Sequence, residues 1–199
     1  MGNSSARTAG QMKDRDLPHV NKVLLRSPRA RGNVMKNPSR FLLDGMLGSL
    51  ARWLRICGYE ASFMENTSDN ELIQRALEED LILLTRDKQL CRKAQKAGLE
   101  YLLVHGDDSV KRLAQVSRRY NLTLTPAQSR CPNCGFSLRK TDKREIEARV
   151  PPRTYQAYDD YWFCKACGKT YWQGSHWRSI LDTVCTASKL ANEVSEQDL

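Results

Sequence analysis

The sequence FLLDGMLGSLARWLRICGYEASF, residues 41–63, contains the pattern that decides the fold. Residues 41–44 form a short apolar run that ends on an acid, which is typical of a buried strand. Leu47, Leu50 and Leu54 then recur at helical spacing, and Gly58 predicts the end of a helix over 46–57. Residues 59–63 are predicted as a second strand. A strand, a helix and a strand in this order form one βαβ unit, whose strands run parallel.

The same alternation continues to residue 120. A helix is predicted to open at residues 68–71, with Leu72, Ile73, Ala76 and Leu77 as its buried stripe. Strands are predicted at 81–84 and 101–104. Helices are predicted at 87–97, where Gly98 ends the helix, and at 109–120. We therefore expect an α/β fold with a mainly parallel sheet flanked by helices.

The composition divides the 199 residues into four parts. We expect a basic, disordered leader over 1–39, the α/β domain over 40–127, a cysteine-bearing module over 128–181 and a tail over 182–199. About 18 consecutive apolar residues are needed to span a membrane, and no such run occurs. We therefore expect no membrane association.

The net charge of +9 is unevenly distributed. Residues 1–40 carry +7, residues 41–127 carry 0, residues 128–181 carry +5 and residues 182–199 carry −3. Lysine and arginine gain affinity for a phosphate backbone because they release its counterions. The asymmetry favours a nucleic-acid partner, although a basic leader is also typical of a solvated, disordered tail.

Cysteine usage indicates the compartment. The chain has seven cysteines, four of them in two C-x-x-C pairs, and its first ten residues lack the apolar segment of a signal peptide. We therefore expect an intracellular, reducing location, and the cytoplasm is favoured over other compartments. The leader is rich in arginine and serine, which leaves organelle targeting open.

The two C-x-x-C pairs predict a structural zinc site with the ligands Cys131, Cys134, Cys164 and Cys167. Two residues between cysteines allow both thiolates to reach one ion from a tight turn, and a glycine follows each pair. Four sulfurs complete the tetrahedral shell, so the metal has no open position for chemistry. The alternative is a pair of redox motifs, which would be expected inside a βαβ unit rather than after it.

Carboxylates follow several predicted strands. Because a parallel sheet places function at the carboxyl ends of its strands, these acids are expected at one rim. Oxygen ligands there suit Mg²⁺ or Mn²⁺, which activate water and stabilise charge on a phosphodiester. Taken singly, each acid is more typical of a helix N-terminus than of catalysis, and Ser68 with Glu71 matches a capping box. The acids are Asp44, Asp69, Glu71, Asp87, Asp107 and Asp108.

Three segments together resemble the Mut-seven C-terminal RNase domain family, a PIN-like fold with a zinc ribbon. They are FLLDGMLGSLARWLR at 41–55, LLTRD at 83–87, and the two cysteine pairs with YWQGSHWR at 171–178. The resemblance implies a divalent-metal-binding, catalytic role for Asp44, Asp69 or Glu71, and Asp87, with Asp107 or Asp108 as a further candidate. It also implies phosphate contacts for Arg52, Arg55 and Arg86.

The cysteine module combines aromatic and basic side chains, as single-stranded nucleic-acid binders do. Within it, His176, Trp177 and Arg178 are candidates for RNA contact, although a histidine beside aromatic residues is more often structural. We expect a metal-dependent ribonuclease whose zinc ribbon assists RNA binding. The alternatives are a non-catalytic RNA- or ribosome-binding protein, and a protein–protein adaptor.

Overall fold

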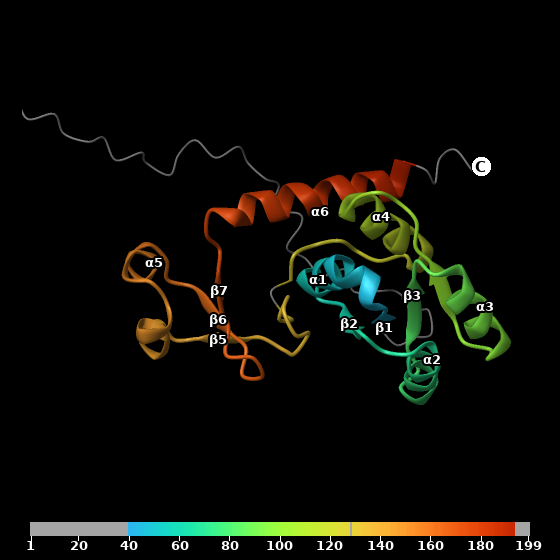
Figure 1. Ribbon diagram of the computed structural model, residues 1–199. Coiled ribbons are helices and arrows are strands. Elements are labelled where there is room, and N and C mark those ends of the chain that lie inside the picture. Colours follow the sequence, from blue (N-terminus) through green and yellow to red (C-terminus); the bar gives the residue numbers. More distant parts are fainter. Residues whose placement is uncertain (1–39, 128, 194–199) are drawn as a thin grey trace, which may run out of the picture. The chain divides into compact units, whose positions relative to one another are not determined.

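A computed structural model describes residues 40–127 and 129–193 of the chain (Figure 1). The leader predicted for residues 1–39 lies outside the described residues, as do the last six residues of the tail. Within the described ranges, no helix is long and apolar enough to cross a membrane.

The first sheet has four parallel strands in the order β2-β1-β3-β4. They are β1 (Arg40–Leu43), β2 (Glu60–Phe63), β3 (Ile82–Thr85) and β4 (Tyr101–Leu103). Helices follow them in turn: α1 (Gly48–Ile56), α2 (Asp69–Glu78), α3 (Lys88–Lys96) and α4 (Ser109–Tyr120). This arrangement confirms the predicted fold class.

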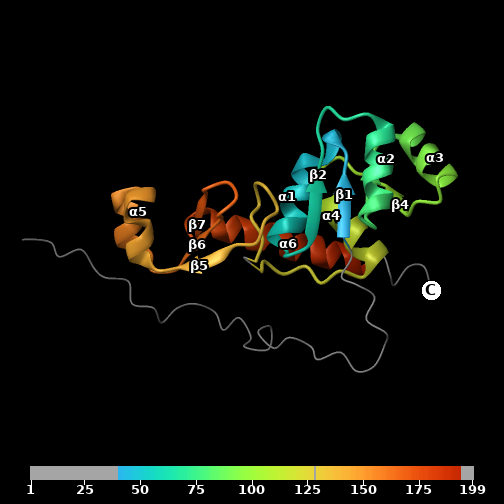
Figure 2. The same cartoon turned by 90° about the horizontal axis from the view of Figure 1, so that it is seen from below.

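The strands alternate their side chains between two apolar layers. Phe41 and Leu43 of β1 pack with residues of α1 and α4, whereas Leu42 packs with residues of α2 and α3. Figure 2 shows α1 and α2 on opposite sides of β1 and β2. All three side chains are 0 % exposed. Burial of each contributes about 1.5–3 kcal/mol. A sheet covered on both faces explains why β1 and β3 are continuous apolar runs rather than alternating ones.

The segment predicted as one helix over 46–57 is divided in the structure. A 3₁₀ turn, η2 (Gly45–Leu47), precedes α1. The carboxylate of Asp44 accepts the backbone N–H of Met46 at 3.0 Å, so the chain turns tightly as soon as β1 ends.

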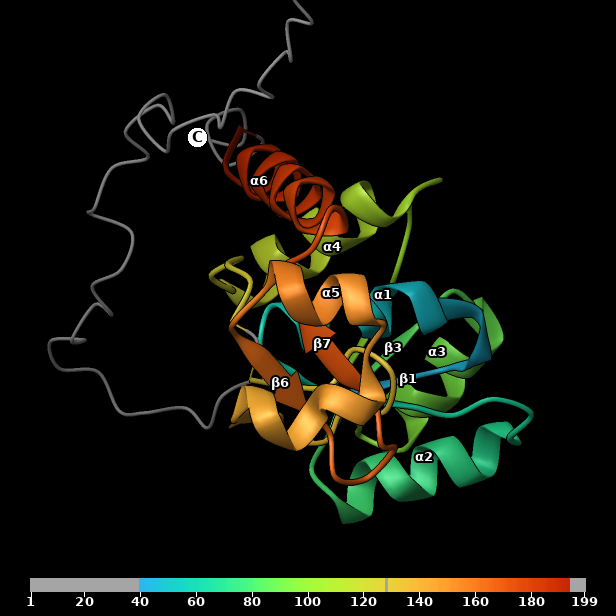
Figure 3. The ribbon, with the colours of Figure 1, turned by 90° about the vertical axis from the view of Figure 1, so that its left-hand side faces the viewer.

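A second, antiparallel sheet has the order β5-β6-β7. Its strands are β5 (Arg139–Thr141), β6 (Tyr161–Phe163) and β7 (Thr170–Trp172). Between β5 and β6 the chain forms η3 (Lys143–Arg149) and α5 (Pro152–Ala157), which lies beside β6 and β7 (Figure 3). A small core of Ile146, Val150 and Tyr161 joins these elements.

The last element, α6 (His176–Glu193), packs against α4 (Figure 1). Val184 and Ala187 of α6 belong to the apolar core under α1 and α4, and the Arg118 guanidinium donates to the carbonyl of Ala191 at 3.3 Å. Residues 182–193, expected as part of a tail, are therefore helical. The reason is an apolar stripe of small side chains that becomes buried only against α4.

Candidate active site and metal centre

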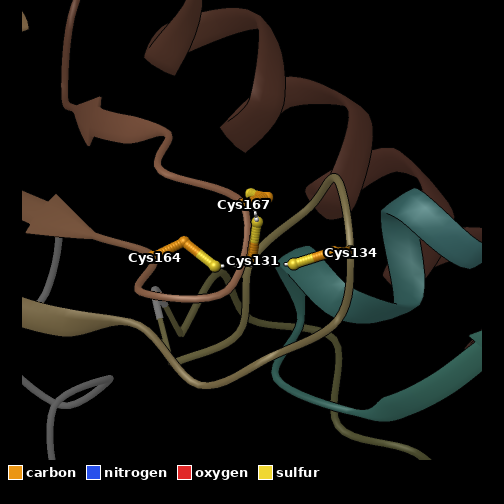
Figure 4. A group of neighbouring side chains, drawn as sticks. All are labelled: Cys131, Cys134, Cys164 and Cys167. Atoms are coloured by element: carbon orange, nitrogen blue, oxygen red, sulfur yellow. Dashed lines mark hydrogen bonds between the residues drawn. The ribbon is translucent and has the colours of Figure 1, made fainter.

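The four paired cysteines point toward one another (Figure 4). Their Sγ atoms all lie within 4.8 Å of one another, with 3.6 Å between Cys131 and Cys167 and 3.4 Å between Cys134 and Cys164. A disulfide needs about 2.05 Å. A tetrahedral zinc ion with Zn–S bonds of about 2.3 Å holds its sulfurs about 3.8 Å apart. The separations therefore fit zinc and exclude disulfides.

The two cysteine pairs have the same backbone geometry. The N–H of Gly135 donates to the carbonyl of Cys131 at 2.8 Å, and Gly168 does the same to Cys164 at 2.9 Å. Both glycines have positive φ, +82° and +71°, which a side chain would disfavour. These turns aim both thiols of a pair at one point, as the spacing predicted.

Neighbouring donors favour a thiolate at Cys131. Burial opposes its ionisation, but the Tyr171 hydroxyl, 3.0 Å from Cys131 Sγ, and nearby backbone N–H groups lower the pKa of the Cys131 thiol to about 6. Burial raises the pKa of the Cys134 thiol, so zinc binding there releases a proton at neutral pH. The donor set is that of a closed, structural zinc site.

Arg55 of α1 connects the first cysteine pair to the parallel sheet. Its side chain is only 6 % exposed. Nε donates to the carbonyl of Ala61 at 2.8 Å, and Nη1 donates to the carbonyl of Asn133 at 2.8 Å. Arg55 was predicted as a phosphate contact, and in the structure two of its nitrogens, Nε and Nη1, donate to backbone carbonyls. Figure 4 shows α1 beside the loop that carries Cys134.

Three of the predicted acids line one pocket at the carboxyl ends of the parallel strands. The pocket has a volume of about 240 Å³ and is bordered by Asp44, Asp69 and Asp87, with Met46 and Met64 among its apolar walls. We call it the acidic pocket. Asp44 follows β1, Asp69 begins α2 and Asp87 precedes α3, so three separate loops contribute. The rule for parallel sheets thus places them together.

The carboxylate of Asp44 is nearly buried, at 6 % exposure, and makes no ion pair with any described residue. A buried carboxylate without a cation is costly. Asp69 pairs with Lys93 at 2.9 Å through Oδ2, and Asp87 uses Oδ1 to cap α3. Oδ1 of Asp69 and Oδ2 of Asp87 accept no hydrogen bond from the part of the chain that the structure describes. Among the described residues, only the four cysteines lie close enough together to share a metal ion as they stand.

Thr85, at the end of β3, was not singled out from the sequence. Its hydroxyl donates to Oδ2 of Asp44 and accepts the backbone N–H of Asp87 at 2.9 Å. It is 0 % exposed. Thr85 therefore fixes the relative placement of two acids of the pocket. The available signal was its position in LLTRD, a polar residue between an apolar strand and an acid.

The remaining acids lie elsewhere. Glu71 reaches back to the N–H and hydroxyl of Ser68, at 2.9 and 2.8 Å, and these bonds lower the pKa of its carboxyl. It forms the capping box that the sequence offered as the alternative, and it does not border the acidic pocket. Asp108 caps α4, and neither it nor Asp107 borders the pocket.

The predicted RNA contacts lie in different places. Arg52 is exposed on α1 and Arg86 is exposed beside Asp87. His176 and Trp177 border a pocket of about 420 Å³ together with Tyr158, Tyr171 and Trp172, which we call the aromatic pocket. Arg178 is exposed on the first turn of α6.

The structure defines a class of protein in which a parallel α/β domain, with an acidic pocket at its strand ends, is followed in the chain by a four-cysteine centre that could hold a metal ion. The family comparison is specific: the model described as the Mut7-C RNAse domain matches residues 39–184. The chain belongs to the Mut7-C RNAse domain family, and membership points to a nuclease function related to RNA. Neither the curated proteins nor the solved structures gave a match.

Proposed function

We propose that this protein is a divalent-metal-dependent ribonuclease that hydrolyses RNA phosphodiester bonds at the acidic pocket. The observation that carries the proposal is the convergence of Asp44, Asp69 and Asp87 from three loops onto one pocket. The zinc ribbon is structural and assists RNA binding. The proposed compartment is intracellular, which agrees with seven cysteines none of which forms a disulfide.

The three carboxylates would hold Mg²⁺ or Mn²⁺. A bound ion of this kind polarises water and offsets charge on the phosphodiester. Asp44 and Asp87 are held in place by backbone N–H groups and by Thr85, which limits the freedom of both carboxylates, and the three acids would draw closer together around a bound ion. Lys93 orients Asp69 and leaves its other oxygen available.

The aromatic pocket supports an RNA partner. Its rings and His176 offer stacking surfaces, and Arg178 lies nearby in the chain at the start of α6. Such contacts are tolerant of base identity, because every base has a face on which an aromatic ring can stack. The expected substrate is therefore single-stranded RNA.

The test compares cleavage of labelled single-stranded RNA with Mn²⁺, with Mg²⁺ and with neither, for the native chain and for Asp44→Asn and Asp87→Asn. Asparagine still caps a helix, so both variants should fold. Asp108→Asn is the matched control, because Asp108 caps α4 outside the acidic pocket. Zinc content is measured in parallel, so that loss of the ribbon is not mistaken for loss of the catalytic ion.

We expect cleavage that requires the added ion, is retained in Asp108→Asn, and falls more than about 100-fold in the other two variants, since even outer partners of metal ligands contribute about 10- to 100-fold. RNA binding without cleavage would refute the nuclease. That result would favour the alternative, a non-catalytic RNA- or ribosome-binding protein. The observation favouring the alternative is that Asp44 and Asp87 both cap a helical turn, which needs no metal.

A further inference from the structure

A second pocket lies where α1 meets the cysteine pairs. It has a volume of about 330 Å³, and we call it the junction pocket. It belongs to neither the zinc site nor the acidic pocket. The side chains that matter for its chemistry are Arg52, Arg55, Phe63, Asn133, Lys169 and Tyr171.

The charge of the junction pocket is positive. Three of its lining residues are cations and none is an acid. Arg55 is engaged elsewhere, because its guanidinium donates to the backbone carbonyls of Ala61 and Asn133. Two cations therefore remain for a ligand.

Those two cations are accessible. Arg52 is exposed and makes no hydrogen bond or ion pair with another described residue. Lys169 is exposed, and its Nζ donates to Oδ1 of Asn133 at 3.0 Å, which holds it at the pocket. An ammonium has three donors and a guanidinium five, so both retain donors for an anion.

The walls of the pocket are aromatic and fixed. The Phe63 ring lies so close to Gly48 that a Cβ on that glycine would meet it at 3.0 Å. The Tyr171 hydroxyl is held by Cys131 Sγ, so its ring is held too. Two cations beside two immobile rings form the combination that binds a phosphate together with the sugar or base next to it.

We propose that the junction pocket binds one phosphate of a single-stranded RNA, with Arg52 and Lys169 as its ligands. The proposed occupant is a segment of the strand that the nuclease acts on, so this part of the inference rests on the proposed function. The phosphate site itself rests on the pocket alone.

The position of the pocket supports this occupant. The junction pocket borders Gly48 and Phe63, and the acidic pocket borders Gly45, Met46 and Met64. Phe63 and Met64 are neighbours at the end of β2, and they pack on opposite sides of the sheet. A strand seated in the junction pocket therefore needs only to cross the carboxyl ends of β1 and β2 to reach the acids.

The experiment measures RNA affinity without cleavage. Full-length protein carrying Asp44→Asn is titrated, without Mg²⁺ or Mn²⁺, into a short fluorescein-labelled single-stranded RNA, and anisotropy is followed at several salt concentrations. Arg52→Gln with Lys169→Gln is compared with Arg92→Gln with Lys96→Gln. The control pair removes two exposed α3 cations that border neither pocket. Zinc content and circular dichroism verify the fold of each protein.

We expect the junction variant to bind about 10-fold more weakly or worse, and the slope of log affinity against log salt to fall by about 0.7, the value for one phosphate of a single strand. The control pair should keep the parent affinity and slope. Equal losses in both pairs, or none in the junction variant, would overturn the proposal. Specific loss of binding in the junction variant, together with no RNA cleavage by the native chain in the metal-dependent assay, would retain the phosphate site and refute only the nuclease.

Discussion

Replacement of Thr85 by valine tests whether the acidic pocket is a positioned metal site. Valine has nearly the shape of threonine, so no cavity forms, but the hydroxyl that joins Asp44 to Asp87 is lost. A hydrogen bond to a charged group contributes about 1.5–3 kcal/mol, and an unpaired buried N–H costs about 1–3 kcal/mol. Asp44 keeps its bond from Met46 and borders a pocket that water can enter. We therefore expect a loss of about 2–4 kcal/mol in unfolding free energy.

The catalytic effect is separable from the effect on stability. Removing an outer partner of a metal ligand costs about 10- to 100-fold in metal affinity or activity. In Thr85→Val we expect the Mn²⁺ concentration for half-maximal RNA cleavage to rise by such a factor, and Thr85→Ser, which keeps the hydroxyl, to restore it. The assay is initial cleavage rate against Mn²⁺ concentration, at a temperature where denaturant titration shows both variants folded.

A matched control is Thr141→Val in the ribbon. Thr141 is also buried, at 7 % exposure, and its hydroxyl bonds to Glu145. The Thr141→Val protein should have a lower unfolding free energy than the native protein, and its RNA cleavage should keep the native dependence on Mn²⁺ concentration. If Thr85→Val cleaves RNA with native Mn²⁺ dependence, or if serine fails to rescue it, the argument that Thr85 positions two metal-binding acids is refuted.

Three further results are expected. Arg55→Met should lower the unfolding free energy by about 2–4 kcal/mol, because backbone carbonyls lose their buried donor. Arg52→Met, on the exposed side of the same helix, should change the unfolding free energy by less than about 0.5 kcal/mol. Equal effects of the two variants in denaturant titration would contradict this expectation. Cys167→Ser should abolish stoichiometric zinc, measured by atomic emission, while the exposed Cys185 can be replaced by serine without loss. The hydrogen bond from Arg40 lowers the pKa of the Glu60 carboxyl, so its stabilisation is full above the unfolded pKa and is lost as pH falls through the folded pKa. The stability difference between native and Glu60→Gln proteins should therefore shrink between about pH 6 and pH 3, and a pH-independent difference would be inconsistent.

The sequence was sufficient to predict the parallel sheet and the four-cysteine cluster. Leu42 and Leu83 lie in runs that only a sheet covered on both faces can bury, and two residues between paired cysteines leave few geometries other than a shared ion. Both patterns are local, because each can be recognised within one short segment of the chain.

The parts that were missed depend on distant backbone. Arg55 donates hydrogen bonds to the backbone carbonyls of residues 61 and 133. Every residue has a backbone carbonyl, so the sequence does not indicate which carbonyls will accept these bonds. The inner face of α6 is formed by Val184 and two alanines, which is too small an apolar stripe to stand out before α4 is placed against it. Asp69 and Glu71 were both expected at the rim of the sheet. The structure distinguishes them, because Glu71 forms a capping box with Ser68 and Asp69 borders the acidic pocket.

The docking of α6 on α4 has a consequence for the order of folding. The helix that completes the apolar layer under α1 and α4 follows both cysteine pairs in the chain, so it is synthesised after them. A nascent chain that has produced all four strands still exposes part of the α4 surface until Val184 and Ala187 arrive. When the cysteines bind zinc, the flexible part of the chain between α4 and α6 becomes shorter. This lowers the entropic cost of docking α6 on α4. Metal supply during synthesis should therefore influence the yield of the α/β domain, although the ion lies outside it.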